Sequence, residues 1–220
     1  MKRLQGVSVA PADVLRSARA LVFDFDGTLV DSNPIKRQAF ERCFADAGER
    51  REEILAYCLS HHHTPRGEKF RHVYERILGR PYTEEVAADL HERFEAATTR
   101  QIIDAPEIPG AGAFLQRVHG RYVTALLSST PQETLLDILA RRGWGGWFGA
   151  VQGAPVHKAS WLKAFRRGRG LEGRDVVFFG DTQEDAAAAD EAGCFFLRVG
   201  EADGALRGLA VSDFTTLLRG

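Results

Sequence analysis

The chain has 220 residues, of which 44% are hydrophobic, and its formal net charge at pH 7 is −1. This size suits one α/β domain with an insertion, and the balanced charge excludes a nucleic-acid binder that relies on bulk positive charge. Cys43, Cys58 and Cys194 are too far apart for a disulfide framework. With no apolar run of membrane-spanning length and no signal peptide, the sequence predicts a cytoplasmic protein with no membrane partner, as a monomer or homodimer.

The first predicted element is a buried strand, residues 20–25, that carries two acidic residues at its tip. Asp24 and Asp26 lie two positions apart, and Gly27 and Thr28 follow with a sharp turn and donors for an anion. Carboxylates are seldom buried without a partner. The strand tip therefore indicates a cation site or proton transfer and not packing.

Residues 33–104 are predicted to be helical throughout. Apolar residues recur at helical spacing in several stretches, and Pro and Gly separate them. Asn33-Pro34 and Thr83 are plausible helix starts. We expect residues 33–104 to be a helical cap inserted into a core made of residues 1–32 and 105–220, with residues 104–109 as the returning connection.

From residue 109 onward, short apolar runs alternate with helical segments. The runs cover residues 122–127, 148–151, 176–179 and 194–199. That alternation predicts parallel strands joined by helices. Together with the first strand they predict a doubly wound, mainly parallel, five-stranded Rossmann-like sheet, in which ligands bind beyond the carboxyl ends of the strands.

The tip of the second strand carries hydroxyl groups. Thr130 suits the N-cap of the next helix, with Pro131 at the first helical position and Glu133 completing a capping box. Capping does not account for Ser128, whose hydroxyl at the strand end suits a phosphate oxygen. The alternative is an ordinary turn serine.

A second acidic pair follows the fourth strand. Asp181 ends that strand, and Asp185 lies one helical turn later, although Thr182-x-x-Asp185 also fits a capping box. Oxygen ligands from Asp24, Asp181 and Asp185 match what Mg²⁺ prefers. Lys158 is either an exposed lysine or the positive charge that a phosphate site with several carboxylates needs.

These residues together resemble the haloacid dehalogenase superfamily of phosphohydrolases. Residues 24–32 resemble its first motif, Ser128 its second, Lys158 its third and residues 180–185 its fourth. The helical stretch after the first motif resembles the branch that contains phosphoglycolate phosphatase and beta-phosphoglucomutase. One departure is Ser129, where this branch often has asparagine.

The resemblance implies a role for each of these residues. Asp24 would attack phosphorus to form an aspartyl-phosphate, and Asp26 would protonate the leaving alcohol and then activate water. The implied Mg²⁺ ligands are Asp24, Asp26 through its main-chain carbonyl, Asp181 and Asp185. Ser128 and Lys158 would contact the phosphoryl oxygens, and Thr28 and Ser129 would help to bind the substrate. The second acid, Asp26, argues against a dehalogenase, which needs no protonated leaving group.

Substrate choice is expected to lie in the cap, around residues 60–69. Arg66 or Lys69 would clamp an anionic or hydroxylated substrate, unless they belong to a solvated face. The histidines 61–63 line the cap mouth, bind metal adventitiously or have no role. The expected function is a Mg²⁺-dependent phosphatase acting on a small phosphate ester, a phosphorylated sugar or small acid. A sugar phosphomutase of the same branch and a non-catalytic binding protein stay open as alternatives.

Overall fold

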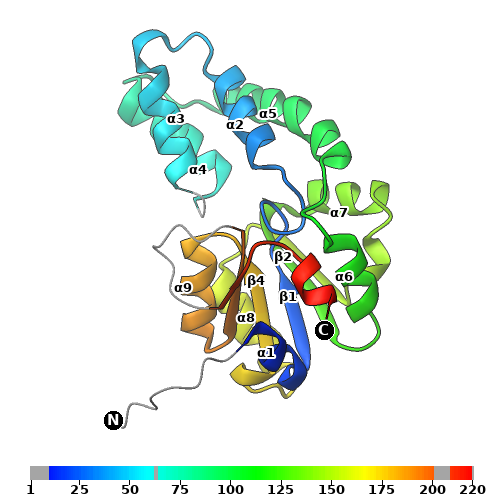
Figure 1. Cartoon of the computed structure of the whole chain (residues 1–220). Coiled ribbons are helices and arrows are strands. Elements are labelled where there is room, and N and C mark those ends of the chain that lie inside the picture. Colours follow the sequence, from blue (N-terminus) through cyan, green and yellow to red (C-terminus); the bar gives the residue numbers. More distant parts are fainter. Residues whose placement is uncertain (1–9, 62–63, 201–208, 220) are drawn as a thin grey trace.

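A six-stranded parallel sheet forms the centre of the larger body, and a group of helices stands above one end of it (Figure 1). The computed structural model describes residues 10–61, 64–200 and 209–219. The strand order is β3-β2-β1-β4-β5-β6. The strands are β1 Ala20–Phe23, β2 Val123–Pro131, β3 Ala150–Ala154, β4 Val176–Gly180, β5 Phe195–Val199 and β6 Leu209–Val211. The chain moves outward from β1 to β3 and then crosses to β4 on the other side of β1, which confirms the doubly wound prediction.

The sheet differs from the predicted one in strand number and in strand bounds: β1 ends at Phe23 and not at residue 25, and β2 continues to Pro131 and not only to residue 127. The sheet has a sixth strand, β6, whose three residues are too few to give an apolar run or an alternating pattern. The third strand covers residues 150–154 and not 148–151, because a 3₁₀ turn at Gly145–Trp147 precedes it and Phe148 packs into the core behind that turn.

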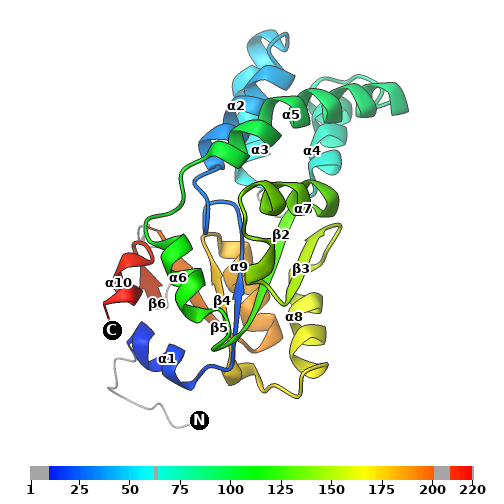
Figure 2. The same ribbon diagram turned by 90° about the vertical axis from the view of Figure 1, so that its right-hand side faces the viewer.

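Helices cover both faces of the sheet (Figure 2). Alternate residues of β1 point to opposite faces, so Leu21 and Phe23 pack in one core cluster, and Ala20 and Val22 pack in the other. The first face is covered by α1 Pro11–Ser17, α6 Ala111–Val118, α7 Gln132–Arg141 and α10 Thr215–Leu218, and the second by α8 Lys158–Arg167 and α9 Gln183–Ala192. Because both faces are covered, every β1 side chain is fully buried.

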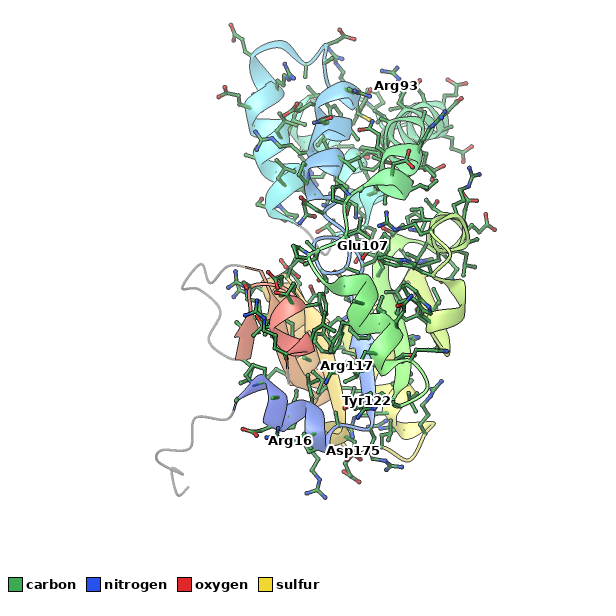
Figure 3. All side chains as sticks on the ribbon, turned by 45° about the vertical axis from the view of Figure 1, so that its right-hand side comes forward. Arg16, Arg93, Glu107, Arg117, Tyr122 and Asp175 are labelled. Atoms are coloured by element: carbon green, nitrogen blue, oxygen red, sulfur yellow. The ribbon has the colours of Figure 1, made fainter. Side chains whose placement is uncertain are left out.

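Hydrogen bonds from the core attach both ends of the described chain. The Tyr122 hydroxyl donates to the Leu15 carbonyl in α1 at 3.2 Å, and Arg117 donates to the Leu218 carbonyl in α10 at 2.7 Å. Figure 3 labels Tyr122 and Arg117 on this side of the sheet. These hydrogen bonds therefore hold α1 and α10 against the first face of the sheet.

The helical insertion lies between β1 and β2, and its described residues form no strand, as predicted. Its helices are α2 Asn33–Cys43, a 3₁₀ turn at Gly48–Arg50, α3 Arg51–Ser60, α4 Arg66–His72, a π-helix at Val73–Ile77 and α5 Glu84–Asp104. They enclose a separate apolar cluster that includes Phe40, Ile54, Phe70 and Phe94. The predicted N-cap of α5 is confirmed, since Thr83 accepts a hydrogen bond from the Val86 amide at 3.3 Å. Among the described residues, no helix combines the length and apolar character needed to cross a membrane.

The outgoing and returning connections of this cap run side by side. The Asp31 amide donates to the Pro106 carbonyl at 2.9 Å, and the Ile108 amide donates to the Leu29 carbonyl at 3.0 Å. Glu107, which lies between Pro106 and Ile108 on the returning connection, accepts a hydrogen bond from the Gly112 amide at the start of α6. Figure 3 shows Glu107 where the cap meets the core. The predicted boundaries, residues 32/33 and 104/105, fall beside these paired segments and stay a prediction.

Arg142, just after α7, holds the returning end of the cap. Its Nη1 atom donates to the carbonyls of Ile102, Ile103 and Ala105 at 3.0, 2.7 and 2.9 Å. The last carbonyls of a helix lack partners within it and form its negative end, so a cation there stabilises α5. A side chain of the α/β core thus supplies the hydrogen bonds at the C-terminal end of α5, the longest of the described helices in the insertion.

Candidate active site

The carboxyl ends of β1 and β4 bring three acidic side chains to one point. Ligand atoms of Asp24, Asp181 and Asp185 all lie within 4.8 Å of one another. The turn after β1 needs glycine, because Gly27 has φ +76° and a Cβ there would lie 2.2 Å from the Asp181 Oδ2 atom. A Cβ at Gly180 would lie 2.6 Å from the Asp185 Cβ atom. Both glycines therefore make room for the cluster.

Lys158 lies inside this cluster and is not an exposed lysine. Its Nζ atom is 3.0 Å from the Asp24 Oδ1 atom and 2.7 Å from the Asp185 Oδ1 atom. Burial opposes the charge on Lys158, but the carboxylates of Asp24 and Asp185 outweigh it and raise the pKa of the ammonium. The lysine is therefore held in its charged form.

The cluster holds three acidic groups and one basic group. Burial, helped by repulsion from neighbouring carboxylates, outweighs the attraction of Lys158 and raises the pKa values of Asp24 and Asp181. Asp181 also accepts hydrogen bonds from Thr28 at 3.3 Å and Asn33 at 3.2 Å. Two buried carboxylates and one partly buried carboxylate offer oxygen atoms beside a single ammonium, and such a set fits a bound hard cation.

Asp185 both faces the acidic cluster and takes part in a capping box, the two alternatives that its sequence position allows. Its Oδ2 atom accepts hydrogen bonds from the Thr182 amide at 3.2 Å and the Thr182 hydroxyl at 2.6 Å, and its own amide donates to the Thr182 Oγ1 atom. The capping box of α9 is thereby present. The other oxygen, Oδ1, faces Lys158, so one side chain both caps the helix and contributes charge to the cluster.

Asp26 lies in a different environment, surrounded by donors. Its Oδ2 atom is 2.6 Å from the Lys36 Nζ atom and accepts hydrogen bonds from Thr130 at 2.7 Å and Ser128 at 3.4 Å, while Oδ1 accepts from Ser32 at 2.6 Å. Burial favours the neutral acid, but Lys36, Ser32 and Thr130 together outweigh it and lower the pKa of Asp26. The two acids of one strand tip thus have pKa values shifted in opposite directions.

The predicted capping role of Thr130 is wrong. Strand β2 continues through Pro131, α7 begins at Gln132, and no side chain caps it at Pro131. Because α7 begins at Gln132, Thr130 lies one residue too early to be its N-cap, and its hydroxyl donates instead to the buried carboxylate of Asp26. Thr130 therefore contacts Asp26 at the candidate site, although its sequence pattern fits a helix N-cap.

Lys36, Ser32 and Asn33 also contact the acids, and the sequence did not predict these contacts. Ser32 is the last residue of the predicted first motif and Asn33 is at a predicted helix start, but neither was assigned a role, and Lys36 was not singled out. Their common signal is position, since α2 starts at the edge of the site and its first turn must lie close to the acids. Nothing in the residue types of this turn distinguishes it from an ordinary helix start.

A cavity of about 480 Å³ lies between the acidic cluster and the cap. Asp24, Asp26 and Lys158 line it from the core, and the predicted cap residues Arg66 and Lys69 line it from the other side. Helix α4 carries both cap residues, and each is largely buried and not part of a solvated face. This is the size and character of a small-molecule site.

Three other predicted residues lie at different depths. Thr28 and Ser128 are fully buried behind the acids, where they donate to Asp181 and Asp26, whereas Ser129 is exposed and lines the cavity. Of the predicted histidine run, His61 contacts the Tyr57 carbonyl at 2.8 Å, and positions 62 and 63 lie outside the described residues.

Comparisons with known proteins agree with this architecture. Residues 18–193 match the family model of haloacid dehalogenase-like hydrolases. A phosphoglycolate phosphatase of Yersinia pseudotuberculosis is 25% identical over 192 residues, which cover 81% of this chain and 79% of that protein.

Solved structures share the fold. A beta-phosphoglucomutase from Clostridium difficile has a TM-score of 0.73 at 17% identity, covering 91% of this chain and 93% of that one. A protein described as a predicted phosphoglycolate phosphatase from Haemophilus somnus has a TM-score of 0.70 at 18% identity, covering 92% and 97%. The chain therefore belongs to the haloacid dehalogenase-like hydrolases, in the phosphoglycolate phosphatase/beta-phosphoglucomutase-like branch whose cap follows the first strand.

Proposed function

We propose that the chain is a Mg²⁺-dependent phosphatase that hydrolyses a small phosphorylated metabolite, a sugar phosphate or a phosphoglycolate-like acid, through an aspartyl-phosphate on Asp24. The observation that carries this proposal is the cluster of Asp24, Asp181 and Asp185 around Lys158 at the core side of the cavity. Asp26 lies two residues after Asp24 and lines the same cavity, where a second carboxyl group can exchange a proton with the leaving alcohol or with water. The similarity to a phosphoglycolate phosphatase supports the substrate class.

In the first half of the reaction, an oxygen of Asp24 forms a bond to phosphorus while the bond from phosphorus to the ester oxygen breaks. Lys158 holds the Asp24 Oδ1 atom and its charge would stabilise the phosphoryl oxygens, with Ser128 as the second proposed contact. The departing alkoxide takes a proton from Asp26. Because Lys36 favours the carboxylate form of Asp26, this step requires the ammonium to leave Oδ2 and Asp26 to take up a proton from solvent before the ester bond breaks.

In the second half, Asp26 takes a proton from water, whose oxygen attacks phosphorus and releases phosphate and the free Asp24 carboxylate. The described arrangement, with Asp26 ionised and held by Thr130 and Ser32, suits this half. The proposed Mg²⁺ ligands are Asp24, the main-chain carbonyl of Asp26, and Asp181, with Asp185 supporting them. When bound, Mg²⁺ supplies positive charge that offsets the charge of the phosphoryl group.

Phosphate release tests this proposal. The wild type and Asp24→Asn would be compared on sugar phosphates, phosphoglycolate, nucleotides and a chromogenic ester, with Mg²⁺ and with a chelator. We expect metal-dependent release that is lost in Asp24→Asn while the circular dichroism spectrum is unchanged. Isomerisation of a sugar phosphate without net phosphate release would indicate a mutase, and binding without turnover would indicate a non-catalytic protein.

A further inference from the structure

The cap half of the cavity is positively charged. Lys36, Arg66 and Lys69 line it from the cap helices, and the described cap residues that line it include no acid. The Arg66 Nη2 atom pairs with the Glu95 Oε1 atom at 2.9 Å, so that charge is balanced within the cap. Lys36 pairs with the core residue Asp26 across the cavity, and Lys69 has no carboxylate partner among the described residues, so these two lysines are the cap charges that a bound molecule can reach.

Lys69 is an ammonium buried without a carboxylate partner among the described residues. It is 7% exposed, its Nζ atom donates to the Cys58 carbonyl at 2.9 Å, and it lies 5.5 Å from the Phe40 ring. The charged groups that act on it are Lys36 and, across the cavity, Glu184. Burial, with a further contribution from Lys36, lowers the pKa of Lys69 to about 8. Burying such a charge is unfavourable, which points to a use for it.

Lys36 is the second lysine, and it stands beside the reacting acids. Its Nζ atom is 2.6 Å from the Asp26 Oδ2 atom, and a quarter of its side chain is exposed toward the cavity side. The two ammonium groups line the same cavity and repel each other. An anion between them would relieve that repulsion and would compete with Asp26 for Lys36.

We propose that Lys36 and Lys69 form an anion subsite that selects phosphate esters whose alcohol part carries a second anionic group. The inference rests on the proposed phosphatase function and narrows its substrate class. The ester phosphate would lie at Asp24 and Lys158, and the second anion would lie a few atoms away, in the cap half of a cavity of about 480 Å³. A sugar phosphate with a neutral alcohol part would leave the Lys69 charge uncompensated and Lys36 on Asp26.

Matched pairs of esters test the subsite. 3-Phosphoglycerate and glycerol 3-phosphate share a carbon skeleton and differ in a carboxylate against a hydroxymethyl group, as do phosphoglycolate and 2-hydroxyethyl phosphate. A sugar bisphosphate adds a second phosphate in place of a carboxylate and shows which anion is preferred. We expect kcat/KM to be at least about tenfold higher for the anionic member of each pair.

The diagnostic variant is Lys69→Met, because Lys69 does not contact the acids. We expect it to remove about tenfold or more of the preference for the anionic ester, through KM, and to change kcat/KM for the neutral ester by less than about threefold. Arg71→Met is the matched control, since it removes an exposed charge from the same helix, where Arg71 pairs with Glu75. Lys69→Arg keeps the charge and should keep most of the preference.

The subsite would be refuted if Lys69→Met lowered kcat/KM equally for the anionic and the neutral ester, or if the wild type showed no preference for the anionic ester. Either result would leave the phosphatase proposal intact. If the wild type hydrolyses no ester, the phosphatase proposal fails instead. The subsite is then measured by calorimetric binding of the same pairs to Asp24→Asn. Binding at least about tenfold tighter to the anionic esters, lost on adding Lys69→Met, supports the subsite, and equal binding refutes it.

Discussion

Replacing Thr130 by valine tests whether its hydroxyl stabilises Asp26 or an adjacent helix. The change removes a donor 2.7 Å from the Asp26 Oδ2 atom at nearly constant side-chain volume. A hydrogen bond to a charged group contributes about 1.5–3 kcal/mol. Because Lys36 and Ser32 still hold the carboxylate at 2.6 Å, we expect the lower end, a loss of about 1.5–2 kcal/mol in the free energy of unfolding.

Urea unfolding in the presence of a chelator measures this loss. With a slope of about 2–3 kcal/mol/M for a chain of this size, the midpoint should fall by roughly 0.5–1 M. The pKa of Asp26 is below its ordinary value of 3.8 in the folded protein, so its ionised form stabilises the fold above about pH 4, and this contribution is lost as the pH falls through the folded pKa. The deficit of Thr130→Val should shrink over the same acidic range.

Thr130→Ser is the control, because it keeps the hydroxyl donor and should lose much less stability. An equal loss in Thr130→Ser and Thr130→Val, independent of pH, would refute the reasoning and assign Thr130 a packing role.

Three further predictions concern the turn, the metal cluster and the cap. Gly27→Ala forces a Cβ to 2.2 Å from the Asp181 Oδ2 atom, so we expect Mg²⁺ binding measured by calorimetry to weaken by tenfold or more, about the scale of a lost supporting contact. Gly48→Ala has a similar φ, +58°, but no atom within 4 Å, so it should cost only about 1 kcal/mol of stability and leave Mg²⁺ binding unchanged; equal metal effects in both would contradict the steric argument. Asp185→Ala should weaken Mg²⁺ binding by about 10–100-fold, and unchanged metal binding with reduced stability would leave it only the capping role. Lys69→Met should raise the free energy of unfolding by roughly 2–3 kcal/mol at pH 7, because the wild type buries an ammonium whose pKa is about 8 when folded and 10.5 ordinarily. As the pH rises, Lys69 loses its proton in the folded wild type before it does so in the unfolded chain. The difference in free energy of unfolding between Lys69→Met and the wild type should therefore decrease from pH 8 to 10.5. A difference that stays constant over this range would contradict the burial argument.

The core and its acidic strand tips were predictable because their signals are local. Runs such as residues 176–179 are apolar at every position, which is typical of a strand covered on both faces. Asp24 and Asp181 stand out at the ends of such runs because nothing about packing requires a carboxylate there. Parallel strands place their carboxyl ends at one edge, so the sequence pattern also predicted that these acids would meet.

The donors around Asp26 were not predictable in the same way. Thr130 has a sequence pattern that fits a capping box, and only the position of Asp26, 104 residues earlier, shows that its hydroxyl donates to a carboxylate. Lys36 lies in the first turns of a cap helix, and its contact with Asp26 depends on how α2 leaves the sheet. Short β6 and the shifted β3 depend likewise on pairing with a neighbouring strand and not on their own residues.

The proposed aspartyl-phosphate on Asp24 is tested most directly by finding which residue carries the phosphoryl group during turnover. The wild type would be mixed with Mg²⁺ and its best ester, quenched in acid within milliseconds, and its peptides examined by mass spectrometry. We expect one phosphoryl group on the peptide that contains Asp24, and none in Asp24→Asn. Turnover at the wild-type rate with the group on another residue, or turnover by Asp24→Asn itself, would contradict the proposal.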